Sequence, residues 1–323
     1  MQPVRWGIIS TAKIGTEKVI PGMQKHAENQ IVAIASRDQA TADATAKRLG
    51  IPKAYGSYQA LLDDPSIEVI YNPLPNHLHV PVTLEAVKRG KHVLCEKPIA
   101  ITAKEAEQLR AVPKGVHVAE AFMVRYNPPW QKARELMQSG ALGRPVGVQV
   151  FFAYFNDDPH NIRNMADIGG GGMLDIGCYP ITVSRFVFGA EPQRVIATIE
   201  RDPKFKTDRT ASGLADFGDG RHLTFTATTQ CFPYQRANIL GTMGRFEIEI
   251  PFNAPPDVPN IATLWQDGQD PQRMEFPIAD QYGLQGVAFG RVVRGLDKPT
   301  YGVDDAIQNM RIIDAFFRSE KSG

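Results

Sequence analysis

Cysteine is scarce in this sequence, and the three that occur, Cys95, Cys178 and Cys231, are scattered along the chain. An odd number without Cys-x-x-Cys spacing predicts neither a disulfide framework nor a zinc site, and it indicates a reducing compartment. No apolar run approaches the roughly 20 residues that a membrane-spanning helix requires. The few residues before the first apolar run leave no room for a signal peptide. We therefore expect a cytoplasmic protein with no membrane partner.

Net charge is lacking as well, because 36 lysines and arginines oppose 35 aspartates and glutamates, for a formal charge of +1. This balance gives no electrostatic reason to expect nucleic acid or an anionic membrane as a partner. What remains is an ordinary globular composition, with 43% hydrophobic and 22% charged residues over 323 positions. A chain of this length suits two domains, each with its own core.

Two glycines are missing from the place where a dinucleotide-binding fingerprint would have them. The apolar run Val4–Ile9 is followed by residues 10–15, which keep the spacing of G-x-G-x-x-G but have Ser10 and Ala12 at the first two glycine positions. Small residues there still let a pyrophosphate approach the start of the next helix. We therefore predict contacts to a dinucleotide from Ser10, Thr11, Ala12, Lys13 and Ile14.

Strand-like apolar runs alternate with helical patterns as far as residue 122. Six such runs, the last of them at residues 116–120, predict a doubly wound Rossmann domain with a parallel sheet over residues 1–122. Residues 123–323 then form a substrate-binding and dimerisation domain of the α+β class. Its hairpin turns predict an open, mainly antiparallel sheet. The last helix, at residues 303–318, is free to pack back on the first domain.

The end of the second strand bears on the choice of cofactor. An NAD enzyme has an acidic residue there for the ribose 2′-hydroxyl, whereas this chain has Ser36 and Arg37. A hydroxyl and a guanidinium bind a 2′-phosphate, so the pair favours NADP(H) over NAD(H). Asp38 follows directly and is an alternative ribose contact. Outside this context, Arg37 would be read as a solvated turn residue.

Two further loops follow predicted strands. Residues 72–79 contain two prolines, which make a rigid loop at the sheet edge, and we expect Pro73, Asn76 and His79 to contact the cofactor. His77 and His79 have no third ligand nearby, so a metal site is not expected. The next strand ends in Glu96-Lys97-Pro98. Because ligands bind at the carboxyl edge of such sheets, Glu96 and Lys97 are candidates for cofactor binding, and Lys97 also for catalysis.

The second domain begins with a predicted helix at about 130–138, which leads into a long strand, 146–155, whose alternating faces are both largely apolar. Such a strand needs cover on both sides, from helices on one and from another subunit on the other, so we expect a homodimer or a dimer of dimers. Further on, four glycines at 169–172 precede a helix and permit close backbone approach to a ligand. Asp175 and Tyr179, four residues apart, share one face of that helix. By themselves they would be read as a helix-terminal acid and a core tyrosine.

Taken together, four motifs resemble the glucose–fructose oxidoreductase / inositol dehydrogenase / rhizopine catabolism (Gfo/Idh/MocA) family over essentially the whole chain. They are residues 10–15, residues 72–79, Glu96-Lys97-Pro98 and Asp175-Ile176-Gly177-Cys178-Tyr179. Many members have His where this chain has Tyr179, and the tyrosine resembles the branch of dimeric dihydrodiol dehydrogenase and of NADP-dependent xylose or glucose dehydrogenases. The resemblance implies NADP(H) as cofactor, and Lys97 with Tyr179 as the catalytic pair.

These residues together predict reversible hydride transfer between NADP(H) and a carbinol or carbonyl carbon of a sugar, polyol or dihydrodiol. Tyr179 would be the general acid/base, with its pKa lowered from about 10 by Lys97. Asp175 would orient a substrate hydroxyl or Lys97, and Arg163 and Tyr154 would hold the sugar-like substrate. The alternative is a non-catalytic NADP-binding sensor, which has no need of the Lys97 and Tyr179 pair. A dehydratase, glycosidase or transferase that uses bound NAD is a third interpretation. It is less consistent with this sequence, because it would favour His at position 179 and this chain has Tyr179.

Overall fold

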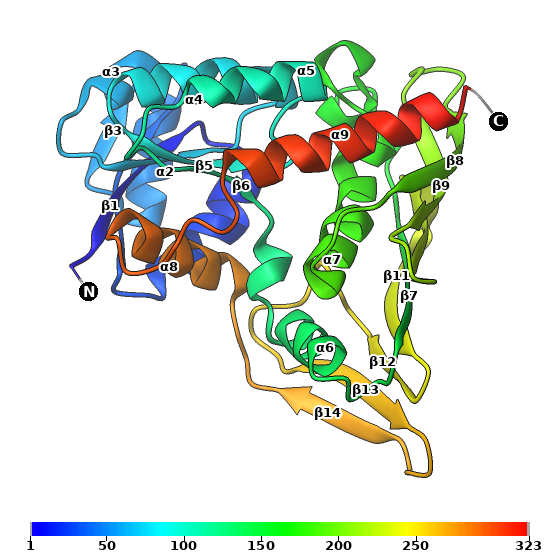
Figure 1. Cartoon of the computed structure of the whole chain (residues 1–323). Helices are drawn as coiled ribbons and strands as arrows, with labels where there is room; N and C mark the ends of the chain where they lie inside the picture. Colours follow the sequence, from blue (N-terminus) through cyan, green and yellow to red (C-terminus); the bar gives the residue numbers. More distant parts are fainter. Residues whose placement is uncertain (1, 322–323) are drawn as a thin grey trace. The chain divides into compact units, whose positions relative to one another are not determined.

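The computed structural model describes residues 2–321, and these divide into two compact units (Figure 1). The first unit runs up to Met123 and also takes Asp280–Met310, and the second comprises Val124–Ala279 and the residues from Arg311 onward. The sequence analysis assigned residues 280–310 to the second domain, so their place in the first unit is a difference from that expectation. Helix α9, Val303–Ser319, is divided between the units.

The first unit contains the expected parallel sheet, in the order β3-β2-β1-β4-β5-β6. Every pairing within it is parallel, and the order reverses between β1 and β4, where a doubly wound sheet opens a crevice at its carboxyl edge. The predicted Rossmann fold class is confirmed. The strands are β1 Val4–Ile9, β2 Asn29–Ala35, β3 Lys53–Tyr55, β4 Val69–Asn72, β5 His92–Glu96 and β6 Val118–Ala121.

Helices connect these strands and cover the sheet. The first begins with a wide π turn, η1 Gly15–Val19, which continues into the short α1. The helices of this unit are α1 Ile20–Gln24, α2 Gln39–Leu49, α3 Tyr58–Asp63, α4 His79–Lys88, α5 Ala103–Ala106 and α8 Gln281–Val293, with 3₁₀ turns η2 Asn76–Leu78 and η3 Glu107–Ala111.

Helix α8 belongs to the first unit because it completes that unit's core. The rings of Phe289 on α8 and Trp6 on β1 lie 5.9 Å apart between centroids, and Trp6 is fully buried. At the start of α8, Asp280 caps the helix by accepting from Tyr282 N–H, and it also pairs with Lys25 at 2.8 Å. An apolar core contact and a capping acid thus hold the returning segment on the sheet.

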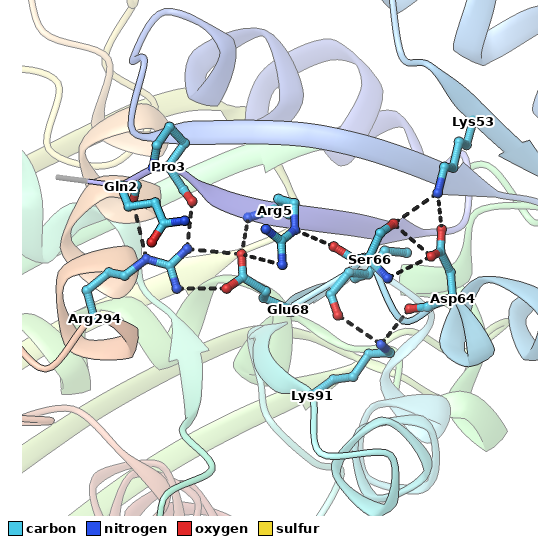
Figure 2. Close-up of polar contacts among 10 residues, drawn as sticks. Gln2, Pro3, Arg5, Lys53, Asp64, Ser66, Glu68, Lys91 and Arg294 are labelled. Atoms are coloured by element: carbon cyan, nitrogen blue, oxygen red, sulfur yellow. Dashed lines mark hydrogen bonds and ion pairs between the residues drawn. The ribbon is translucent and has the colours of Figure 1, made fainter.

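The amino edge of the parallel sheet has a network of ionic contacts (Figure 2). Arg294, just after α8, donates to both carboxylate oxygens of Glu68, at 2.7 and 3.0 Å, and to the backbone carbonyls of Gln2 and Pro3. Lys91 donates to the backbone oxygens of Asp64 and Ile67. These contacts join the starts of β1, β4 and β5 to the end of α8. Charge at this edge therefore stabilises the fold, and the opposite edge remains available for ligands.

The second unit is built on an eight-stranded sheet in the order β14-β13-β12-β11-β7-β10-β9-β8. Only β7 and β10 are parallel, so the predicted open, mainly antiparallel sheet is confirmed. The strands are β7 Pro145–Phe155, β8 Arg194–Arg201, β9 Asp208–Asp216, β10 His222–Thr228, β11 Gln230–Gly241, β12 Gly244–Ile248, β13 Asn260–Gln266 and β14 Gln272–Phe276.

Helices cover one face of this sheet (Figure 1). Helix α6, Pro128–Gln138, contacts β12 and β13, and α7, Cys178–Phe188, contacts β7 and β10. Short turns precede them: η4 Met123–Tyr126, η5 Ile162–Asn164, η6 Ala166–Ile168 and the π turn η7 Met173–Gly177, which runs directly into α7. Alternate residues of β7, among them Val148, Val150 and Phe152, are buried beneath the helices. The opposite face has Phe151 and the half-exposed Ile196.

Candidate functional site

The turn after β1 has a left-handed backbone conformation at Ser10, which explains why dinucleotide-binding proteins usually have glycine at this position. Ser10 has φ 79°, in the left-handed region, and its Oγ accepts a hydrogen bond from Ala12 N–H at 3.3 Å. That conformation costs a serine of the order of 1 kcal/mol, which a glycine would not pay. A Cβ atom at Gly15 would stand 3.5 Å from the Tyr71 ring and 3.6 Å from Pro73, so the first helix packs close to the end of β4. The turn predicted to meet a pyrophosphate is therefore formed without two of its three glycines.

The end of β2 presents the two residues predicted to select NADP. Arg37 is exposed, while Ser36 is nearly buried and its Oγ accepts from Asp38 N–H. Asp38 is the N-cap of α2: its carboxylate accepts from Thr41 N–H at 2.8 Å, and the hydrogen bonds from Thr41 lower its pKa. Asp38, the alternative ribose contact in the sequence analysis, therefore has its carboxylate engaged in capping α2. Arg37 keeps an exposed guanidinium beside the crevice.

Tyr58, at the start of α3, is a neighbour of Arg37 that the sequence analysis did not single out. Burial raises the pKa of Tyr58, and the positive charge of Arg37 partly offsets that rise, so the two side chains lie near each other. An aromatic ring next to an arginine at this edge suits a base-plus-phosphate ligand. The order of the strands brings α3 to the end of β2. A single tyrosine in a short helix does not indicate this neighbourhood, so the sequence alone could not identify Tyr58.

The loop after β4 is held from within. Asn72 is fully buried, accepts from Leu74 N–H at 3.3 Å and donates to the backbone oxygen of His79 at 3.2 Å. Pro73 is buried next to Gly15, and Asn76 begins the 3₁₀ turn η2. The loop therefore has a fixed shape at the β1–β4 switch point, as a cofactor loop requires.

His79 has a bracing role in this structure, and the cofactor contact that the sequence analysis expected of it remains a prediction. It is 1% exposed, and its ring nitrogens lie 2.6 Å from the carbonyl oxygens of Pro98 and Leu74. Burial lowers the pKa of His79 to about 4, so the ring is neutral and donates to one of these carbonyls at a time. With both nitrogens facing the backbone, His79 joins the loop after β4 to the segment after β5.

That segment contains Lys97. Its backbone N–H donates to Glu96 Oε2 at 3.3 Å, while the hydroxyl of Tyr71 donates to Glu96 Oε1 at 2.7 Å. Beyond Pro98, the backbone N–H of Ile99 donates to the buried carboxylate of Glu120 at 2.8 Å. Glu96, His79 and Glu120 thus fix the main chain on either side of Lys97. The predicted cofactor contact of Glu96 remains a prediction, and the structure gives Glu96 this bracing role besides.

The second unit brings together the three polar residues predicted to meet the substrate. Tyr154, near the end of β7, donates its hydroxyl to Asp175 Oδ2 at 2.6 Å, and Arg163 Nε lies 2.9 Å from the same oxygen. The Asp175 side chain is 12% exposed and that of Arg163 is 42% exposed. The three form a cluster with one inner acid and an outward-facing guanidinium. Such a cluster can bind the vicinal hydroxyls of a polyol.

The electrostatics of this cluster decide what each member can do. Burial, and then the charge of Asp175, raises the pKa of Tyr154 well above its usual value, so this tyrosine is a hydrogen-bond donor and not a base at neutral pH. Asp175 likewise raises the pKa of Arg163, which stays charged. Asp175 is therefore an ionised acceptor held by two donors.

Tyr179 lies one turn further along the same helical stretch, in the first turn of α7. It is 6% exposed, and its ring packs against Phe152 on β7 and Phe252 after β12, with centroids 5.9 and 5.2 Å away. Two aromatic neighbours fix the plane of the ring. Lys97 and Tyr179 belong to different units, and their pairing in catalysis is taken up below as a proposal.

Two of the four glycines before this helix, Gly170 and Gly171, are needed for contacts within the chain. Gly171, at φ 124°, lies so close to Asp208 that a Cβ atom there would be 2.0 Å from Asp208 Oδ1. A Cβ at Gly170 would be 2.6 Å from the backbone oxygens of Arg163 and Met165. The sequence analysis expected a ligand to approach this backbone, and the approach that the structure shows is that of Asp208. No local pattern pointed to Asp208, which lies 37 positions along the chain.

Metal ligands do not gather anywhere in the described part of the chain: between residues 2 and 321 no group of three or more His, Cys, Asp or Glu side chains is placed to hold an ion. Over the same residues, no helix is both long and apolar enough to span a bilayer.

Comparison with known proteins agrees with this geometry. Residues 4–124 match the model of an oxidoreductase family with an NAD-binding Rossmann fold, and residues 130–247 match a GFO/IDH/MocA C-terminal domain. An uncharacterized oxidoreductase of Rhizobium meliloti is 40% identical, with 100% of this chain and 98% of the relative covered. D-xylose 1-dehydrogenase (NADP⁺) 2 of Haloferax volcanii is 37% identical over 98% of each chain.

Two further proteins extend the comparison. Trans-1,2-dihydrobenzene-1,2-diol dehydrogenase of Mus musculus is 34% identical, with 76% of this chain and 74% of the relative covered. Among solved structures, a 3-ketoreductase from Actinomadura kijaniata in complex with NADP and TDP-benzene superposes with a TM-score of 0.90 at 26% identity, over 98% of each chain.

Proposed function

Because the chain belongs to the Gfo/Idh/MocA oxidoreductase family, we propose that it transfers a hydride between NADP(H) and a carbinol or carbonyl carbon of a sugar, polyol or dihydrodiol. The observation that carries this proposal is the Tyr154–Asp175–Arg163 cluster, whose Asp175 lies one helical turn before Tyr179. An ionised acid between two donors, followed by a tyrosine with a fixed ring, is an arrangement for binding a polyol and moving a proton. The xylose and dihydrodiol dehydrogenases among the relatives support the substrate class.

The residues at the carboxyl edge of the parallel sheet fit a dinucleotide with a 2′-phosphate. The turn at Ser10 and the loop at Pro73 and Asn76 would face the pyrophosphate and the nicotinamide half at the β1–β4 switch point. Arg37 is exposed next to Tyr58 and would bind the 2′-phosphate, with the Asp38 carboxylate bound to Thr41 at the helix cap. When bound, this cofactor supplies or accepts the hydride.

The protein's part is to place the substrate and handle a proton. Tyr179 is proposed as the general acid/base on the reacting oxygen, with Lys97 favouring its phenolate. Tyr154 is a poor candidate for that role because its pKa is raised by burial and by Asp175. Asp175 would accept from a substrate hydroxyl, and Arg163 would donate to a second one. Lys97 can serve because the segment around it is braced by Glu96, His79 and Glu120.

Absorbance at 340 nm tests the proposal directly. We expect reduction of NADP⁺ with at least one class among aldoses, polyols and dihydrodiols, and a Tyr179→Phe variant with turnover reduced far more than its affinity for NADPH. Activity with NAD⁺ alone would leave an oxidoreductase but refute the argument from Ser36 and Arg37. If NADPH binds and no member of the panel reacts, the NADP-binding sensor becomes the better explanation.

The assembly that we propose is a homodimer, or a dimer of such dimers, formed through the open face of the eight-stranded sheet. What supports it is a shallow hollow of about 410 Å³ lined by residues of β7, β8, β9 and β10, among them Phe151, Ile196 and Leu214. The lining includes apolar side chains, with Ile196 45% exposed, and a pair of hydroxyls, Ser212 and Thr226, which lie 2.8 Å apart. An apolar strand face of this kind is normally covered.

Light scattering during size-exclusion chromatography tests the assembly. We expect at least twice the monomer mass, and a shift to the monomer on Leu214→Arg, which places a charge in the hollow. Ile278→Arg is the matched control, because Ile278 is 58% exposed and lies outside the sheet. Monomer mass for the wild-type protein at all concentrations would refute the dimer without touching the proposed chemistry.

A further inference from the structure

We infer that Asp208 is a positioning residue of the substrate site. It holds the glycine turn, which is hydrogen-bonded to the backbone of Arg163, and the first helical turn, from which Asp175 projects. The inference rests on the proposed function, because it concerns the same cluster. Asp208 touches neither cofactor nor substrate in this scheme. It acts through the main chain of residues 163–175.

The contacts run in one continuous path. Asp208, the first residue of β9, accepts a hydrogen bond from the backbone N–H of Met173, the first residue of η7. Its other carboxylate oxygen lies against Gly171, and its backbone oxygen is 3.3 Å from where a Cβ of Gly172 would stand. One carboxylate therefore meets both the glycine turn and the orphan N–H group at the start of the helix.

The same glycine turn also anchors the other members of the cluster. Gly171 donates its N–H to the backbone oxygen of Arg163 at 2.8 Å, and its carbonyl accepts from Asp175 N–H at 3.0 Å. Gly170 donates to Met165 at 2.9 Å. A shift of Gly171 would thus move the backbone of Arg163 and Asp175 together. Since these two side chains share one ion pair at 2.9 Å, even a small shift alters the polar surface offered to a substrate.

The burial of Asp208 shows that this arrangement is costly to maintain. The residue is 6% exposed, and its partner at the helix start is a backbone N–H. Burial raises the pKa of Asp208 to about 6, with the charge of Arg201 lowering it and that of Glu320 raising it. A glycine at φ 124° is needed to make room for it. A buried acid and a glycine with positive φ therefore meet at the turn that holds Arg163 and Asp175, and this convergence points to the substrate site.

The test compares two isosteric variants. Asp208→Asn keeps an acceptor for Met173 N–H but removes the charge. Asp202→Asn is the control, because Asp202 is also buried, at 7% exposed, and also caps a turn, accepting from Lys204 and Phe205 N–H, yet has no contact with the glycine turn. Gly171→Ala is a third variant, which pushes Asp208 away without altering it. Each protein is normalised by its NADPH-binding stoichiometry, so that loss of folded protein is not counted.

We expect Asp208→Asn and Gly171→Ala to lower kcat/KM for the sugar by at least tenfold, partly through a higher sugar KM, with the KM for NADP⁺ within twofold of wild type. Hydrogen exchange in the peptide over residues 169–176 should rise in both variants and stay unchanged in Asp202→Asn. Sugar kinetics within twofold of wild type, or an equal loss in Asp202→Asn, would overturn the inference.

Hydrogen exchange also separates this inference from the proposed function. If the wild-type protein reduces NADP⁺ with no member of the panel, the proposed function fails by that result. Unchanged exchange over residues 169–176 in Asp208→Asn would overturn the positioning role whatever the substrate. A purely structural role would appear as lower NADPH-binding stoichiometry with unchanged sugar KM, which also contradicts the inference.

Discussion

Replacement of Tyr154 by phenylalanine removes one hydroxyl and leaves the half-buried ring in place. In the wild-type protein this hydroxyl donates to Asp175 Oδ2 at 2.6 Å, the shorter of the two contacts to that oxygen. After the change, Arg163 still pairs with Asp175. The acid is 12% exposed, so water has limited access to the vacated position. Asp175 should then adopt a wider range of orientations toward the substrate.

The magnitude follows from the type of bond. A hydrogen bond to a charged acceptor contributes about 1.5–3 kcal/mol, and the Arg163 contact that remains preserves part of the orientation of Asp175. Since each 1.36 kcal/mol corresponds to a factor of ten in rate, we expect kcat/KM for the sugar to fall by about 10- to 100-fold. The KM for NADP⁺ should not change, because Tyr154 lies in the second unit.

The pH profile adds a second criterion. Burial and the charge of Asp175 raise the pKa of Tyr154 above the assay range, so its hydroxyl remains a donor throughout. The ratio of wild-type to Tyr154→Phe activity, measured at 340 nm, should therefore be flat between pH 6 and 9. Tyr234→Phe, which removes a hydroxyl from an exposed ring on the same sheet, is the control. An unchanged kcat/KM would refute the role of the Tyr154–Asp175 bond, and a loss above about 10⁴-fold would make Tyr154 itself the acid/base.

Three further predictions concern the first unit. Arg37→Gln should raise the KM for NADP⁺ at least tenfold and leave that for NAD⁺ within twofold, and equal effects on both would contradict the 2′-phosphate role. Burial, and then the charge of His117, lowers the pKa of His92 to about 4. Because the unfolded chain binds this proton near pH 6.5 and the folded protein does not, the free energy of unfolding falls as the pH drops from 6.5 toward 4. The variant His92→Asn keeps an acceptor for the backbone N–H of His117. Between pH 7 and pH 5, its free energy of unfolding in urea should fall by about 1–2 kcal/mol less than that of the wild-type protein, a figure that allows for partial exposure. An identical fall in both proteins would refute this prediction. Arg294→Met should cost about 2–3 kcal/mol, because two backbone carbonyls lose their donor and Glu68 loses one of its two arginine partners, keeping Arg5. A cost below about 0.5 kcal/mol would show that the edge network in Figure 2 is dispensable.

The spacing of apolar residues predicted most helices and strands, because an element with one buried face repeats apolar residues at its own period. The first strand was predicted at 4–9 and is β1 Val4–Ile9, the long strand at 146–155 is β7 Pro145–Phe155, and the last helix at 303–318 is α9 Val303–Ser319. In each case apolar residues face one partner surface throughout the element. Such elements are set by their own residues, and the surroundings change their ends by one or two positions.

The grouping of elements was harder to predict than the elements. Helix α8 was predicted at 282–296 and is Gln281–Val293, yet it belongs to the first unit. Its apolar residues would suit either core. What decides is a particular match, with Phe289 against Trp6 and Asp280 against Lys25, across more than 250 positions of chain. Contacts between residues so far apart in the chain produce no repeating pattern in a single sequence, so only the three-dimensional structure reveals them.

The same reason explains why the candidate site was predicted only in part. Residues that act from strand ends, such as Arg37 and Lys97, are found from sequence because the sheet topology places them at one edge. His79 and Asp208 act through backbone groups, and their partners are set by how loops pack. Four consecutive glycines are a visible signal, but a glycine marks only that something approaches the main chain. Whether a ligand or another residue does so depends on where β9 begins relative to that turn, and at Gly171 the residue is Asp208.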